Sequence, residues 1–158
     1  MSVTSFLKKI FGDKSVRDLK AIQPKLKAIK DEMPRIAALD NDGLRREIDN
    51  VRAAIAQATA DDRAAIEKLR EEVESLPFDK RQPLWDKIDA HEKSILDIIE
   101  NQLNEHLPVV FATVRETAKR FAENETIVVT ATDFDRELAG QGREFVSIDG
   151  DKAIWKNR

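Results

Sequence analysis

The sequence of 158 residues contains no cysteine, no tyrosine, and only five glycines and five prolines. Without cysteine the chain can form no disulfide, no thiolate metal site and no thiol nucleophile. The scarcity of glycine and proline argues against collagen-like, low-complexity and turn-rich all-β chains. No apolar run approaches the roughly 20 residues of a membrane span, and lysines interrupt the first twelve residues, unlike the apolar core of a secretory signal. The length predicts one ordinary domain. The sequence predicts neither a membrane span nor a secretory signal in it.

Charged residues make up 36% of the chain, and their distribution is uneven although the formal net charge is only −3. Residues 1–30 contain eight basic and two acidic side chains, whereas the remaining 128 residues contain 19 basic and 28 acidic ones. A basic end can bind an anionic membrane, a nucleic acid or an acidic protein surface. The aromatic residues and arginine clusters of nucleic-acid modules are missing downstream, so we predict no nucleic-acid partner.

Residues 1–14 predict a short amphipathic helix, in which apolar side chains recur at helical spacing opposite two lysines. These residues are Phe6, Leu7, Ile10 and Phe11, with Lys8 and Lys9 on the other side. Gly12 is expected to end this helix. The apolar face could pack on the protein body or contact a partner, and the lysines favour a membrane or partner surface.

Residues 15–57 predict two further helices. The first begins with Ser15 as N-cap and Asp18 completing a capping box, and Pro24 should kink or restart it. Its apolar stripe is Val16, Leu19, Ile22, Leu26 and Ile29. The second begins at Asp40, and its buried face is expected to comprise Leu44, Ile48, Val51 and Ile55.

Residues 58–106 predict an antiparallel helical hairpin, because two apolar stripes of alternating three- and four-residue spacing flank a turn at 76–79. The predicted seam consists of Ile66, Leu69, Val73, Leu76, Leu84, Ile88, Ile95 and Ile98. His91 also falls on this seam, where we interpret it as a polar residue that sets the register of the two helices.

Beyond the hairpin the pattern predicts a helix over 107–122, opened by Pro108, and a small β segment over 123–158. The helix should bury a stripe of Val110, Val114, Ala118 and Phe121, flanked by Phe111. Three strands are expected in the β segment, with a sheet edge near the C-terminus and a hairpin turn at the Asp149-Gly150 pair. Thr132 and Asp135 should form a capping box for a short helix between the first two strands. The fold class is therefore mainly α, with a small antiparallel sheet at the C-terminal end.

The sequence carries little that could perform catalysis. His91 and His106 lack a second ligand at metal-binding spacing. Asp133 and Asp135 could bind a divalent cation or act as an acid–base pair in an extended segment, but capping explains both. The pair Gly140 and Gly142 is not followed by a Gly-Lys-Ser or Gly-Lys-Thr motif, so the isolated chain is predicted neither to bind nor to hydrolyse ATP. We therefore expect no catalytic, cofactor-binding or metal-binding residue in this chain.

Four stretches together resemble the N-terminus of the SecA family, and the clearest similarity covers 5–55 and 107–122. They are Phe6–Gly12, Arg17–Lys20, Leu39–Arg45 and Leu107–Arg120. The hairpin and the strand segment look like insertions that a subset of the family carries. One departure is Gly43, where the family usually has an acidic residue, so the capping box begun by Asp40 is incomplete. Because the chain ends at Arg158 within a predicted strand, we interpret it as a fragment.

The resemblance implies an N-terminal part of an ATP-driven motor that moves secretory preproteins through the SecYEG channel. It implies a cytoplasmic protein that is peripherally associated with the inner membrane, with ATP and Mg²⁺ bound by the full-length family beyond this sequence. Only Phe6, Leu7, Lys8, Lys9, Ile10 and Phe11 transfer as the membrane and channel contact. The expected partners are SecYEG, an anionic lipid surface and preprotein. The alternative is a stand-alone helical hairpin that binds a partner protein.

Overall fold

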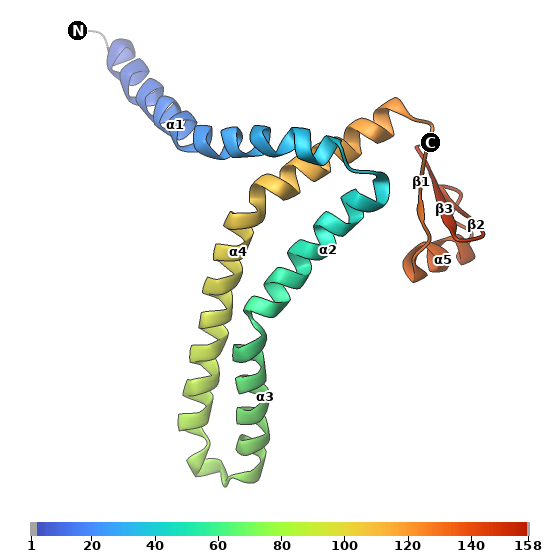
Figure 1. The fold of residues 1–158 in the computed structure, drawn as a ribbon. Coiled ribbons are helices and arrows are strands. Elements are labelled where there is room, and N and C mark those ends of the chain that lie inside the picture. Colours follow the sequence, from blue (N-terminus) through green and yellow to red (C-terminus); the bar gives the residue numbers. More distant parts are fainter. Residues whose placement is uncertain (1–2, 158) are drawn as a thin grey trace. The chain divides into compact units, whose positions relative to one another are not determined.

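The structure is a computed structural model that describes the backbone of residues 3–157 and the side chains of residues 16–157. Within this range it is mainly helical, with a small antiparallel sheet near the C-terminal end, as the sequence predicts (Figure 1). The chain divides into two compact units, one formed by residues up to Leu44 together with those from Pro108, and the other by Arg45–Leu107. The finer division into five segments stays a prediction.

Helix α1 spans Val3–Ala37 without interruption, so the predictions that Gly12 ends one helix and Ser15 caps another are wrong. Glycine costs only about 1 kcal/mol within a helix, which does not enforce an end. Pro24 and Pro34 both lie inside α1, so Pro24 does not restart it. The stripe predicted from Val16 is largely exposed: Leu19 and Ile22 retain 59% and 56% of their accessible surface.

Helix α2 spans Asn41–Ala58 and begins as predicted, because the Asp40 carboxylate accepts a hydrogen bond from the Gly43 backbone N–H at 2.6 Å. The cap therefore forms although Gly43 has no side chain to reciprocate. Leu44 and Val51 are buried on the predicted face. Thr59 separates α2 from α3, and its buried hydroxyl donates to the Ile55 carbonyl at 3.0 Å.

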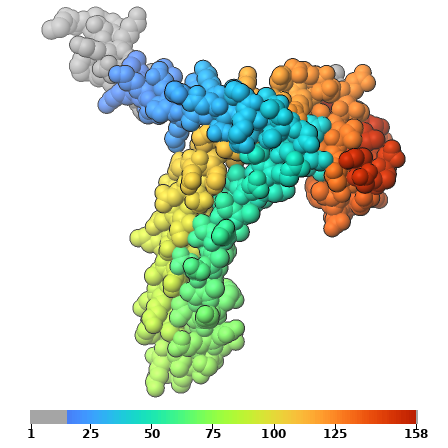
Figure 2. All heavy atoms as spheres, viewed as in Figure 1, coloured from blue at the N-terminus to red at the C-terminus, as the bar shows by residue number. Residues whose placement is uncertain are grey.

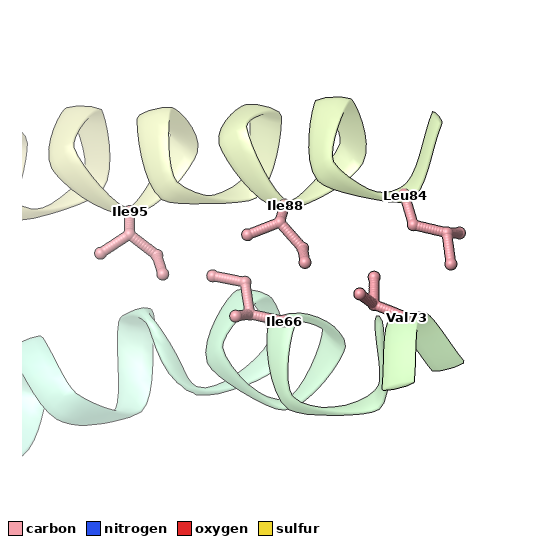
Figure 3. Packing of buried hydrophobic residues seen from close by; sticks show 5 residues of the cluster. All are labelled: Ile66, Val73, Leu84, Ile88 and Ile95. Carbon is pink, nitrogen blue, oxygen red and sulfur yellow. The ribbon is translucent and has the colours of Figure 1, made fainter. Parts of the chain in front are cut away.

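Helices α3 (Ala60–Ser75) and α4 (Gln82–Glu123) form the predicted hairpin, joined by the 3₁₀ turn η1 at Phe78–Lys80. Figure 3 shows the side chains of Ile66 and Val73 facing those of Leu84, Ile88 and Ile95 across the seam. Ile88 is only 2% exposed. In the space-filling view the two arms pack against each other (Figure 2). Hydrophobic burial along this seam gives the unit its own core.

Helix α4 continues through Pro108, so the prediction of a new helix at this proline is wrong. Proline removes only the bond to the carbonyl four residues earlier, and packed residues on both sides keep the helix formed. The predicted stripe is also incorrect, because Val114 is 61% exposed whereas Ala112 is buried against Ile36 and Leu44. The hydroxyl of Thr113 donates to the Val109 carbonyl at 2.8 Å, which permits its burial on this face.

The sheet contains β1 (Thr126–Thr130), β2 (Val146–Asp149) and β3 (Lys152–Lys156), in the order β1-β3-β2 with antiparallel pairing throughout. The three strands are confirmed, but the C-terminal strand lies in the centre and forms no edge. Gly150 occupies the turn between β2 and β3 with a φ of 58°, a conformation that favours glycine. Helix α5 (Asp133–Gly140) carries the predicted capping box of Thr132 and Asp135.

Candidate functional site

The membrane and channel contact predicted from sequence lies outside the residues whose side chains the structure describes. These predicted residues are Phe6, Leu7, Lys8, Lys9, Ile10 and Phe11. Among the described residues, α1 continues as a basic helix with an exposed apolar stripe. The stripe consists of Val16, Leu19, Ile22 and Leu26, between 45% and 59% exposed. No described helix has the length and apolar character required to cross a bilayer.

His91 joins the two arms of the hairpin through a polar contact. Its Nδ1 atom lies 2.7 Å from Oδ1 of Asp62 in the first turn of α3, and the Ser94 hydroxyl donates to Oδ2 of Asp62 at 2.8 Å. Hydrogen bonds from His91 and then Ser94 hold the pKa of the Asp62 carboxyl below its usual value of 3.8. The position of His91 on the seam was predictable from its heptad spacing, whereas its partner was not.

Asp133 and Asp135 do not form an acid–base pair. Asp135 is fully buried and accepts hydrogen bonds from the backbone N–H and hydroxyl of Thr132 and from the indole N–H of Trp155. Asp133 is exposed. Asp135 therefore links the start of α5 to the central strand β3, and its role is structural. Among the described residues, no cluster of three or more metal-ligating side chains occurs.

Arg120 anchors the end of α4 to the segment between α1 and α2, a feature that sequence reasoning missed. Its guanidinium donates to Glu116 at 2.9 Å, to the Asn41 side-chain oxygen at 2.8 Å and to the Leu39 carbonyl at 2.6 Å. The planar guanidinium of arginine donates to several acceptors in fixed directions, which the ammonium group of lysine cannot reproduce. The stretch ending at Arg120 is also the one that most closely resembled the SecA family.

Asp42 connects α2 to the sheet in the same unit. Its carboxylate accepts hydrogen bonds from both the backbone N–H and the hydroxyl of Thr130, at 2.8 Å each. The neighbouring Asn41 side chain donates to the Val128 carbonyl at 3.1 Å. The backbone of β1 is therefore fixed to the start of α2, so the small sheet has a defined attachment within its unit.

The glycine pair Gly140 and Gly142 does not have the geometry of a phosphate-binding loop. Gly140 and Gly142 lie at the C-terminal end of α5 rather than before a helix N-terminus. An anion at this end of α5 would meet backbone carbonyl groups and the negative end of the helix dipole. A phosphate-binding loop instead presents backbone N–H groups. No lysine follows the glycine pair to contact a phosphate. Gly140 and Gly142 are therefore placed as the end of a helix and not as a nucleotide-binding loop.

The hairpin carries a surface groove to which no role is assigned. A groove of about 470 Å³ lies between α3 and α4, and the residues that line it include Arg63, Ile66, Arg70, Glu92, Ile95 and Leu96. Arg70 spans the groove to Glu92, with 3.5 Å between Nη2 and Oε1. Nearby apolar side chains remain exposed, including Leu96 at 66% and Leu103 at 55%. Exposed apolar surface of this kind can accept another apolar segment.

Comparison with known proteins identifies the class to which these features belong. The family model described as the SecA DEAD-like domain matches residues 7–141 of the chain. The chain belongs to the SecA family, as its sequence motifs predicted. No solved structure matches the chain.

Relatives named protein translocase subunit SecA match nearly the whole chain. The subunit from Bacteroides fragilis is 49% identical over 157 residues, those from Porphyromonas gingivalis (strain ATCC 33277) and Phocaeicola vulgatus are 46% and 44% identical, and each match covers 99% of this chain. The chain spans 14% of the length of each of these relatives. The similarity therefore includes the hairpin and the strand segment and is not confined to 5–55 and 107–122.

Proposed function

We propose that the chain acts in protein translocation as the N-terminal part of an ATP-driven motor that moves secretory preproteins through the SecYEG channel. In this proposal the chain supplies membrane and channel contact and accessory structure, while ATP and Mg²⁺ bind to other parts of a full-length protein. The protein is cytoplasmic and peripherally associated with the inner membrane. The observation that carries the proposal is the 49% identity to a SecA subunit along 99% of this chain.

The charge and exposure of the N-terminal region support contact with an anionic lipid surface. Residues 1–30 contain eight basic side chains, and the part of α1 that follows the predicted contact exposes Val16, Leu19 and Ile22. Lysines contribute about 1 kcal/mol each near an anionic bilayer, and apolar side chains add burial at the interface. Ordering the backbone offsets part of this gain, so we expect weak and reversible binding.

Co-sedimentation of the chain with vesicles tests this contact. Binding to anionic phosphatidylglycerol vesicles should fall in the Lys8→Glu/Lys9→Glu variant and in the Phe6→Ser/Phe11→Ser variant, and salt should weaken wild-type binding. The matched control is Lys87→Glu/Lys93→Glu, which makes the same charge change on exposed hairpin positions. Equal binding to neutral phosphatidylcholine vesicles, or no loss in either N-terminal variant, would show that the predicted contact is absent.

A segment exchange tests the role in translocation. The matching 157-residue segment of the Bacteroides fragilis subunit is replaced by this chain, and export of a secretory preprotein is measured in that organism. We expect the hybrid to support export and the same hybrid carrying Phe6→Ser/Phe11→Ser to support it less. A hybrid that accumulates to normal levels without exporting preprotein would contradict the proposal.

A stand-alone interaction module is the second candidate, because Arg45–Leu107 forms a compact unit with its own apolar core. The two candidates differ in the exchange experiment. A translocation part should restore export within the hybrid, whereas an independent module should fold and bind a partner without restoring it.

A further inference from the structure

Helix α4 carries a second apolar stripe beside the seam of the hairpin. This stripe consists of Trp85, Leu96 and Leu103, which are 43%, 66% and 55% exposed. Trp85 and Leu96 each follow a buried seam residue by one position, and one residue turns a helix by about 100°. Separations of 11 and seven residues keep all three on one side of α4, the Leu96 side. The Leu96 side therefore retains exposed apolar surface after the hairpin has formed.

The spacing of the stripe indicates that a helix packs on it. Separations of 11 and seven residues are sums of the three- and four-residue steps of a heptad repeat. Helix α4 thus presents one heptad stripe to α3 and a second one on the Leu96 side, as each helix of a three-stranded coiled coil does. The stripe is about 27 Å long, so a helix of about 18 residues covers it. The groove between α3 and α4 next to Leu96 is where such a third helix would lie.

The opposite flank of the seam is polar. His91 and Ser94 lie there on α4 and contact the Asp62 carboxylate of α3. Helical periodicity places Ser94 and Leu96 on opposite flanks of the seam residue Ile95. A third helix would therefore pack on the Leu96 side alone.

Acidic side chains border the Leu96 side. By helical spacing this side carries five acidic and two basic residues, which are Glu67, Glu74, Asp89, Glu92 and Glu100 with Arg63 and Arg70. Arg70 already lies 3.0 Å from Glu67 and 3.5 Å from Glu92. The carboxylates of Asp89 and Glu100, in contrast, form no ion pair with any residue that the structure describes.

These two carboxylates specify the charge of the helix that packs there. Asp89 and Glu100 are 11 residues apart, about 16 Å along α4, and both are exposed at the outer border of the stripe. A helix that carries basic side chains at this spacing, along one border of its own apolar stripe, would pair with both. Apolar contact supplies the attraction, and complementary charge sets the choice and the orientation of the partner.

We propose that the Leu96 side of the hairpin binds a basic amphipathic helix of another protein. The apolar stripe of that helix packs on Trp85, Leu96 and Leu103 and completes a three-helix coiled coil with α3 and α4. Its basic side chains lie against Asp89 and Glu100. This inference goes beyond the proposed function, because it gives the hairpin a binding role that needs neither a membrane nor a preprotein.

Titration of the whole chain with two designed peptides tests this surface in the absence of lipid. Both peptides are fluorescently labelled helices of about 21 residues with leucine at heptad positions a and d, and they differ only in lysine or glutamate along one border of the stripe. We expect the lysine peptide to bind about tenfold or more tightly than the glutamate peptide in fluorescence anisotropy. Binding should shift tryptophan emission to shorter wavelength, and Trp85→Phe should abolish the shift. Equal affinity for the two peptides, or no binding of the lysine peptide up to about 0.1 mM, would overturn the inference.

An uncharged substitution isolates the apolar part of the contact. Leu96→Ser/Leu103→Ser should weaken binding of the lysine peptide about tenfold or more, because it removes the centre of the stripe. The matched control is Val128→Ser/Phe134→Ser, at exposed apolar positions outside the hairpin, which should bind as wild type does. Circular dichroism verifies that each variant is folded. Wild-type affinity in a folded Leu96→Ser/Leu103→Ser variant would show that the peptide binds elsewhere.

Charge reversal tests the border of the stripe. Asp89→Lys/Glu100→Lys should reverse the preference, so that the glutamate peptide binds more tightly than the lysine peptide. The matched control is Asp61→Lys/Glu72→Lys, which makes the same charge change at the same 11-residue separation on exposed positions of α3 turned away from the groove. A preference that both variants change equally would show that net charge, and not these two carboxylates, selects the peptide.

Photo-crosslinking in the segment-exchange hybrid identifies the natural occupant. A benzophenone side chain is introduced at Leu103 and, as the control, at Glu72 on the far side of α3. We expect mass spectrometry to find, for Leu103 alone, a cross-linked segment of another protein with a helical apolar stripe bordered by basic residues. Cross-links only to the hybrid itself, to preprotein or to lipid, or no cross-link specific to Leu103, would overturn the inference.

Discussion

His91 Nδ1 on α4 lies 2.7 Å from Asp62 Oδ1 on α3, across the seam of the hairpin. The Ser94 hydroxyl donates a hydrogen bond to Oδ2, the second oxygen of the same carboxylate, at 2.8 Å. Asp62 is in the first turn of α3, where the positive end of the helix dipole also favours an ionised carboxylate. This contact fixes one register of α3 against α4, which the apolar residues alone specify less strictly.

Loss of the Asp62 carboxylate should make hairpin stability less sensitive to acid. The folded-state pKa of Asp62 is lowered below 3.8, so its contribution is fully present above pH 3.8 and is lost as the pH falls through the lowered folded value. Asp62→Asn should lower the urea midpoint at pH 7, and the difference from wild type should shrink below pH 3.8. Asp61→Asn, at the exposed neighbouring position, is the control. A difference that is constant from pH 7 to pH 2 would contradict this assignment.

Truncation of Ile88 should destabilise the hairpin strongly. Ile88 is 2% exposed within the cluster of Ile66, Val73, Leu84 and Ile95, so Ile88→Ala should cost about 2 to 5 kcal/mol of unfolding free energy. Ile95→Ala should act in the same direction. Phe78→Ala at the turn is the control, because an 88% exposed side chain should change stability by less than about 0.5 kcal/mol. An unchanged denaturation midpoint in Ile88→Ala would show that the seam is misplaced.

Replacement of Arg120 should loosen the connection between α4 and the α1–α2 segment. Arg120→Met removes the bonds to Asn41 and to the Leu39 carbonyl and should cost about 1.5 to 3 kcal/mol. Arg120→Lys should recover little, since an ammonium cannot reproduce the planar fork. Lys119→Met, at a 55% exposed side chain, is the control in urea denaturation. Full recovery by lysine would mean that charge, and not geometry, is what matters.

Removal of the Trp155 indole N–H should destabilise the sheet. Trp155→Phe keeps an aromatic ring but leaves Asp135 Oδ1 without its donor at 3.0 Å, which should cost about 1 to 3 kcal/mol. The matched control is Trp85→Phe, at a 43% exposed position. Each variant retains one tryptophan, so fluorescence can follow unfolding in both. Equal midpoints for the two variants would show that the buried hydrogen bond contributes nothing.

Local patterns were sufficient for much of the fold. The heptad spacing of the hairpin, the Asp40 cap, the Thr132–Asp135 capping box and the Asp-Gly turn each depend on residues close in sequence. These patterns can be recognised in a sequence because helical periodicity and capping interactions involve residues only a few positions apart. The motif ending at Arg120 also indicated the family, and the comparisons confirm it.

The sequence by itself thus determined the helical hairpin, the three strands, the caps at Asp40 and Thr132 and the family, whereas the tertiary structure decided helix continuity, buried faces and strand order. Pro108 predicted a break, yet α4 is continuous, because packing on both sides outweighs one lost hydrogen bond. The apolar pattern predicted that Val114 is buried, yet Ala112 and Thr113 are buried instead. The small Ala112 side chain permits close approach of the neighbouring helices, and the Thr113 hydroxyl donates to a carbonyl of its own helix. β3 lies between β1 and β2, because strand order depends on pairings between residues far apart in the chain, which no local window contains.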